Sequence, residues 1–145
     1  MAYCNSDDIA ASPDECFAAL TDYERLPEWQ GAVKRIAVLE RDDRGRGTVV
    51  EYEIDAKVKT VRYRLRQVYD EPHRLGSEYL DGDFKNFSGE WRFTDNGDGT
   101  TRVELELDID PGRFVPGPVK SAIREFVMTR ALKDLKAHLE TPILA

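Results

Sequence analysis

The sequence is short of positive charge, and this shortage excludes two classes of partner. Its 145 residues include 21 Lys and Arg against 28 Asp and Glu, which gives a formal net charge of -7. Proteins that bind nucleic acid or dock on anionic membranes usually carry an excess of Lys and Arg. We therefore expect neither nucleic acid nor an anionic membrane surface as a partner.

Long apolar runs and paired cysteines are also missing. No stretch approaches the roughly 20 apolar residues that a membrane-spanning helix requires, and the first residues, MAYCNSDDIA, lack a basic segment followed by an apolar run. We therefore expect no transmembrane segment and a cytoplasmic location. Cys4 and Cys16 have neither metal-binding spacing nor a neighbouring His. They are predicted to be reduced, partly buried thiols.

Recognisable catalytic and metal-binding motifs are lacking as well. His73 lies in a predicted turn and His138 near the end of the last predicted helix, and neither has partners spaced like those of a catalytic triad. The stretch from Asp95 resembles a calcium loop, but Gly97 and Gly99 stand where oxygen ligands are needed. We expect no metal and no cofactor, and we assign no catalytic residue.

What is present suffices for one core. Apolar residues make up 41% of the chain and charged residues 34%, so the charges must be segregated onto an outer face. The length is that of one ordinary domain. We expect one domain over residues 1–145.

Two short helices are predicted near the start. Ser12 followed by Glu15 is a capping box, and Pro13 suits a first helical position, so a helix is expected from about Pro13 to Leu20. Asp22 can cap a second short turn through Leu26, which the following proline should limit. Helices this short are marginal alone in water, so they must pack on something larger.

That larger element is predicted to be an antiparallel sheet. Residues 33–110 alternate between apolar and charged side chains, most clearly in TRVELELDID, as in a sheet with one solvated face. Short clusters of Gly, Asp and Asn separate the runs and are typical of hairpin turns. We predict about six strands in a meander and an edge strand near Tyr3 to Ile9. The inward-facing set includes Val50, Tyr52, Ile54, Val61, Tyr63, Leu65, Gln67, Tyr69, Val103, Leu105, Leu107 and Ile109.

One long helix is predicted from Gly117 to about Glu140, and its apolar stripe changes side. Such a helix needs two burial surfaces or a bend near Val127 and Met128. Arg130 projects on the first side, so it either points inward or pairs with Asp134 and reaches water; the second is favoured because a buried unpaired charge is costly. The two sets are Val119, Ala122, Ile123, Phe126 and Val127 on one side, and Met128, Ala131, Leu132, Leu135 and Leu139 on the other.

The predicted interior is rich in aromatic side chains. Gly89 lies among them on the inward set, between Phe87 and Trp91. A filled core with a glycine that lets the sheet bend accounts for this pattern. Alternatively, a curved sheet with a helix across its mouth leaves a cavity lined by apolar groups and a few polar ones. The aromatic set is Trp29, Tyr52, Tyr63, Tyr69, Phe87, Trp91 and Phe93.

This order of elements, with the stretches ASPDECFAALTDYERLPEWQ, GEWRF, GDGTTRVELELDID and ALKDLKAHLE, resembles the START-like (SRPBCC) superfamily over essentially the whole chain. More narrowly it is similar to the polyketide cyclase/dehydrase and lipid-transport branch, which includes coenzyme Q-binding proteins. The resemblance implies an α+β helix-grip fold. In it, a curved antiparallel sheet of about seven strands holds the long C-terminal helix, leaving an apolar cavity. The two short helices would close one end, with Trp29 near the closure.

Three functions remain open under this resemblance. The first, which we rank highest, is binding or transport of a hydrophobic small molecule such as a lipid, an isoprenoid quinone or a polyketide. The second is a cofactor-independent polyketide aromatase/cyclase, which would require Arg130 and a tyrosine, Tyr52 or Tyr63, to converge inside the cavity. The third is a protein-interaction module that meets a protein partner through an exposed apolar patch over Val119, Ile123 and Val127.

Ten residues are the candidates for contact with a ligand in the cavity. If a carrier function is correct, Tyr63→Ala should weaken ligand binding without unfolding the protein. The candidates are Trp29, Tyr52, Ile54, Tyr63, Leu65, Phe87, Trp91, Leu105, Phe126 and Arg130.

Overall fold

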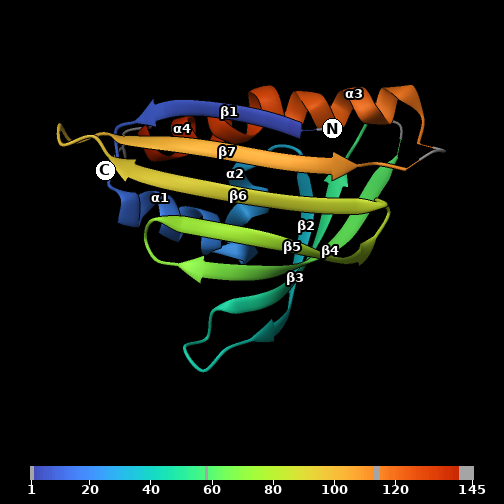
Figure 1. Cartoon of the computed structure of the whole chain (residues 1–145), viewed down its shortest axis with the longest axis horizontal. Helices are drawn as coiled ribbons and strands as arrows, with labels where there is room; N and C mark the ends of the chain where they lie inside the picture. Colours follow the sequence, from blue (N-terminus) through green and yellow to red (C-terminus); the bar gives the residue numbers. More distant parts are fainter. Residues whose placement is uncertain (1, 58, 113–114, 141–145) are drawn as a thin grey trace.

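The computed structural model describes residues 2–57, 59–112 and 115–140, except for the side chain of residue 127. Figure 1 shows a curved sheet with the C-terminal helical segment running along β1 and β7. The strands are β1 (Ala2–Ile9), β2 (Val33–Arg41), β3 (Gly47–Asp55), β4 (Thr60–Asp70), β5 (Arg74–Gly82), β6 (Asn86–Asp95) and β7 (Thr101–Asp110). The helical elements are α1 (Pro13–Thr21), the 3-10 turn η1 (Tyr23–Arg25), α2 (Leu26–Trp29), α3 (Gly117–Glu125), the π-helical turn η2 (Phe126–Arg130) and α4 (Ala131–Glu140).

The described strands form one antiparallel sheet in the order β1-β7-β6-β5-β4-β3-β2. β1 pairs with β7 so that Ile9 lies opposite Thr101, which makes β1 the predicted edge strand. The short helices contact both the sheet and the long helical segment: α1 contacts β6 and α4, and α2 contacts β2 and α4. These features confirm the predicted helix-grip fold.

The alternation predicted for the strands is confirmed. In β4, Val61, Tyr63 and Leu65 are buried while the arginines between them are exposed. On the outer face, Arg62 approaches Glu53 to 2.7 Å. Similar Arg–Glu pairs extend across β6 and β7, so the outer face carries the charge that the interior excludes.

The first helix begins as predicted, but the second differs. The Ser12 Oγ accepts a hydrogen bond from the Glu15 N–H at 3.1 Å, and the Glu15 Oε1 accepts from the Ser12 N–H at 3.2 Å. Pro27 does not limit the second turn. It occupies the first turn of α2, where no N–H donor is required. The Asp22 side chain makes no capping hydrogen bond within the described residues.

Of the two alternatives expected for the long helix, the structure shows two burial surfaces: α3 packs into one hydrophobic cluster through Val119 and Ile123, and α4 packs into another through Leu135. The π turn η2 lies between them. A π turn contains one more residue than an α turn, so it rotates the apolar stripe between α3 and α4. The Met128 carbonyl in this turn accepts a hydrogen bond from Asn5 Nδ2 at 3.0 Å. The Met128 side chain, expected to be buried, is 41% exposed, because the stripe resumes only at Ala131 and Leu132. The Val127 side chain lies outside the described part of the chain.

The two cysteines differ from one another. Cys16 is buried and free, and burial raises the pKa of its thiol to about 11, so the thiol stays protonated at neutral pH. Cys4 is also free, but it is exposed, contrary to the expectation that both are partly buried. Among the described residues, no helix has the length and apolar character needed to cross a membrane.

Candidate functional site

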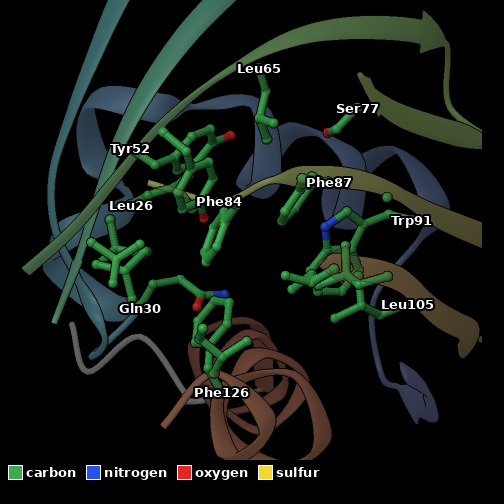
Figure 2. A pocket seen from close by; sticks show the side chains of 18 of the residues that line it. Leu26, Gln30, Tyr52, Leu65, Ser77, Phe84, Phe87, Trp91, Leu105 and Phe126 are labelled. Atoms are coloured by element: carbon green, nitrogen blue, oxygen red, sulfur yellow. The ribbon is translucent and has the colours of Figure 1, made fainter. Parts of the chain in front are cut away.

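A cavity of about 100 Å³ lies between the concave face of the sheet and the α2 and α3 helices. Figure 2 shows its wall, with Leu65, Phe87, Trp91 and Leu105 on the strand side and Phe126 on the long helix. A cavity of roughly 150 Å³ can hold benzene. The space in this partly open cavity is therefore somewhat smaller than one that holds a single aromatic ring.

Most of the predicted candidates line this cavity. They come from β3, β4, β6 and β7, where the alternation of the strand turns them inward, and from the start of the π turn. The lining candidates are Tyr52, Ile54, Tyr63, Leu65, Phe87, Trp91, Leu105 and Phe126.

The other two candidates, Trp29 and Arg130, are not among the described residues that line the cavity. The Trp29 ring stacks on His138 with ring centroids 4.6 Å apart and planes at 5°, which joins α2 to α4. The Arg130 guanidinium lies against Gly31, where it would collide with any added side chain. The expected Arg130–Asp134 ion pair does not form in the described part of the chain, and Asp134 Oδ2 instead accepts from the Gly31 N–H at 3.0 Å. Arg130 and a tyrosine therefore do not converge in the cavity.

Sequence reasoning missed several lining residues, among them Gln30 and Phe84. Gln30 follows a helix of only four residues, and Phe84 lies in the turn between β5 and β6. Neither segment has a periodic pattern that would assign its side chains to a face. A large aromatic residue inside a Gly- and Asp-rich turn, as in DGDFKN, was the available signal for Phe84.

An aromatic cluster forms one wall. The Tyr63 ring stacks on Tyr52 at a centroid distance of 5.4 Å and on Phe87 at 5.3 Å. Phe84 lies 5.2 Å from the same ring. Tyr63→Ala would leave a void within this cluster, at a cost of about 3–5 kcal/mol by analogy with other aromatic truncations. Tyr63→Phe, which keeps the ring, is therefore the better probe of its hydroxyl.

Buried and partly buried polar side chains form hydrogen bonds beside the aromatic wall. Gln67 Nε2 donates to the Tyr52 hydroxyl at 2.8 Å, and Gln67 Oε1 accepts from Ser77 Oγ at 2.5 Å. Further along the wall, the Tyr69 hydroxyl donates to the Gly47 carbonyl and lies 2.7 Å from the Tyr23 hydroxyl, which must therefore be the donor to Tyr69. These bonds fix the orientation of the tyrosines.

Burial raises the pKa of the hydroxyls in this region. Desolvation is the main cause for Tyr23, Tyr52 and Tyr63, because a tyrosinate would lose its hydration. For Tyr52 the nearby Tyr63 acts in the same direction, while the hydrogen bond from Gln67 opposes the shift. All three side chains are therefore neutral at physiological pH.

The lining contains little charge. Within the described residues, its charged members are Asp55 and Glu90, and neither Lys nor Arg lines the cavity. The Glu90 carboxylate is held on the outer face by Arg74 and Arg92, with an Arg92 Nε–Glu90 Oε2 distance of 2.6 Å. No cluster of metal-ligating side chains occurs among the residues that the structure describes.

The apolar patch expected of an interaction module is not found. Val119 is 1% exposed and Ile123 is 8% exposed, because both pack into the core beneath α3. The third member of that patch, Val127, has a side chain outside the described residues. The two described members therefore offer no surface to a partner.

Solved structures share this fold at low sequence identity. A START superfamily protein from Mycobacterium smegmatis is 22% identical, with a TM-score of 0.84 over 96% of this chain and 97% of its own. A protein from Thermus thermophilus is 24% identical, with a TM-score of 0.82 over 96% and 97% of the two chains. The Zhui aromatase/cyclase from Streptomyces sp. R1128 is 18% identical, with a TM-score of 0.77 over 96% and 91%.

Family membership follows from the sequence itself. No curated protein matches the chain. The model of the family described as polyketide cyclase / dehydrase and lipid transport, however, matches residues 5–140, nearly the whole chain. The chain therefore belongs to the polyketide cyclase/dehydrase and lipid transport family.

Proposed function

We propose that this protein binds and carries a hydrophobic small molecule, such as a lipid, an isoprenoid quinone or a polyketide, in the cavity beneath α3. The observation that carries the proposal is the partly enclosed, largely apolar space faced by the Tyr63 aromatic cluster. Water makes few favourable contacts with such a surface. An apolar ligand that enters the cavity displaces this water and removes its own apolar surface from solvent, which favours binding.

The size of the cavity sets a condition on the ligand. At about 100 Å³ the cavity is smaller than the roughly 150 Å³ that holds benzene, so even a single ring requires small shifts of the lining side chains. A larger molecule must displace lining side chains, and Phe126 is well placed to move because it is only half-buried and begins the π turn. Binding of such a molecule would couple to movement of the long helix.

Filling the cavity is expected to abolish ligand binding. Ala122 lines the cavity from α3, so in Ala122→Phe the new ring would occupy the space that a ligand needs. We expect the affinity for the uncharged fluorescent probe N-phenyl-1-naphthylamine to fall more than about tenfold, since the probe would lose its buried apolar contact. Probe fluorescence during titration measures the affinity.

The matched control is Ser121→Phe. Ser121 is the exposed neighbour of Ala122 on α3, so the same ring added there remains outside the cavity and binding should persist. Circular dichroism checks that both variants are folded. Equal probe affinity in Ala122→Phe and the natural protein would place binding outside the cavity and contradict the proposal.

A polyketide aromatase/cyclase is the second candidate. It is favoured by the fold shared with the Zhui aromatase/cyclase and by the hydrogen-bonded Tyr52–Gln67–Ser77 chain at the wall. A positioned tyrosine could exchange a proton with a bound poly-keto chain. Recovery of a cyclised product after incubation with such a chain, and its loss in Tyr52→Phe, would support this candidate over a carrier.

A further inference from the structure

Gln30 carries an unsatisfied hydrogen-bond acceptor on the cavity wall. Its side chain is 3% exposed, and its Oε1 has no hydrogen-bond partner within the described residues. Figure 2 shows this side chain reaching across the cavity toward Phe126. A buried acceptor without a partner is destabilising because it has lost its hydrogen bond to water, and a ligand that supplies the missing donor removes this penalty.

The orientation of the Gln30 amide follows from its other contact. Gln30 Nε2 donates to the Ala131 carbonyl at 3.3 Å. A carbonyl can only accept, so the opposite orientation would set two oxygens against each other. The nitrogen must therefore face Ala131, and the oxygen is left for whatever enters the cavity.

Tyr63 supplies a second unpartnered polar group. The side chain is 7% exposed and lines the cavity, and desolvation alone acts on its hydroxyl, which makes no hydrogen bond to the described residues. The stacking on Tyr52 and Phe87 holds the ring in place. A ligand oxygen next to this ring can accept the Tyr63 O–H.

Charge sets the remaining requirement. The charged lining residues in the described chain are Asp55, which is exposed, and Glu90, whose carboxylate is held on the outer face. None of the described lining residues is basic, so none of them can neutralise a ligand anion. Moving a carboxylate from water into such a cavity is strongly unfavourable unless the carboxylate is paired with a positive charge. The cavity therefore disfavours fatty acids and other anions that an apolar surface alone would accept.

Resting on the proposed binding function, we infer that the cavity selects an uncharged aromatic ligand bearing a hydroxyl, whose O–H donates to Gln30 Oε1 and whose other oxygen substituent, where present, accepts from Tyr63. The class is that of neutral phenols and hydroxylated ring compounds. Gln30 is the residue that sets the preference for a ligand with a hydrogen-bond donor.

The test compares three naphthalene probes by isothermal titration calorimetry at neutral pH. The probes are 2-naphthol, with a donor; 2-methoxynaphthalene, without one; and the anion 2-naphthoate. We expect 2-naphthol to bind about tenfold more tightly than 2-methoxynaphthalene, because only 2-naphthol can donate a hydrogen bond to the buried Gln30 oxygen. The anion should bind at least about tenfold more weakly than the methoxy compound.

The variant Gln30→Met separates this preference from general stability. Methionine has a similar length but offers no comparable acceptor. It also loses the bond to the Ala131 carbonyl, but this loss affects both neutral probes equally. We expect the ratio of the two neutral affinities to fall to about one.

The outcomes distinguish this inference from the proposed function. Equal binding of the two neutral probes to the natural protein, or a preference that survives in Gln30→Met, would overturn the role of Gln30 while leaving cavity binding intact. If Gln30→Met does not fold, the comparison of 2-naphthol with 2-methoxynaphthalene in the natural protein still tests the inference, and equal affinities would overturn it. If neither these probes nor N-phenyl-1-naphthylamine binds, the proposed function fails and this inference fails with it.

Discussion

Raising the pH above about 10 is expected to unfold the protein steeply, because three buried tyrosines must then give up their protons. Burial raises the pKa of Tyr23, Tyr52 and Tyr63 above that of an unfolded tyrosine. Their stabilising effect is thus fully present below the unfolded pKa and is lost as the pH rises through the folded pKa. Each group contributes a slope of about 1.4 kcal/mol per pH unit, so the three together give roughly 4 kcal/mol per unit.

Two measurements check this expectation. Urea unfolding at a series of pH values gives the free energy of unfolding, and absorbance near 295 nm reports tyrosinate. The buried tyrosines should ionise in one step that coincides with the loss of circular dichroism. In Tyr63→Phe the slope should fall by about 1.4 kcal/mol per unit. Gradual ionisation near the unfolded pKa with the fold intact would show that these hydroxyls are accessible to water.

Gly82→Ala is expected to destabilise the protein by roughly 3–5 kcal/mol, from backbone strain and a steric clash together. Gly82 ends β5 opposite Tyr63, with φ at +141°. A Cβ there would lie 2.5 Å from the Arg62 carbonyl oxygen and from the Tyr63 Cα. Both are backbone atoms, so relief requires β4 and β5 to separate where Tyr63 enters the cavity wall.

Gly97→Ala is the matched control for this variant. Gly97 also has a positive φ, +81°, but an added Cβ would meet nothing within 4 Å. Its cost should be limited to backbone strain, about 1–2 kcal/mol. Urea unfolding compares the two variants. Equal losses would mean that the close approach to Arg62 and Tyr63 contributes nothing.

The sheet and much of the cavity could be predicted because burial of one face imposes a period of two. Once TRVELELDID and the run around Tyr63 are aligned to that period, the inward set follows, and it supplied most β-strand members of the lining. Leu75 and Ser77 of β5 were not among them. The change of buried side at η2 was predictable for a similar reason, since the apolar residues before and after it lie on different sides of the helix. No other pattern in the sequence indicates the extra residue of the π turn.

The remaining features depend on contacts that no local pattern specifies. Gln30 and Phe84 lie in segments too short for a period, and their side chains are placed by the helix and strands around them. Trp29 was expected near the end of the cavity, yet the position of His138, more than 100 residues away, decides its stacking partner. Arg130 depends in the same way on Gly31, which accommodates its guanidinium because it has no side chain.

Native mass spectrometry of the protein purified from its own host tests the central claim most directly. Extraction under denaturing conditions would release any bound molecule for identification. The account predicts one molecule per chain, mainly apolar, uncharged and carrying a hydroxylated ring. A chain that is consistently empty, and whose thermal unfolding is unchanged by N-phenyl-1-naphthylamine or 2-naphthol, would contradict it.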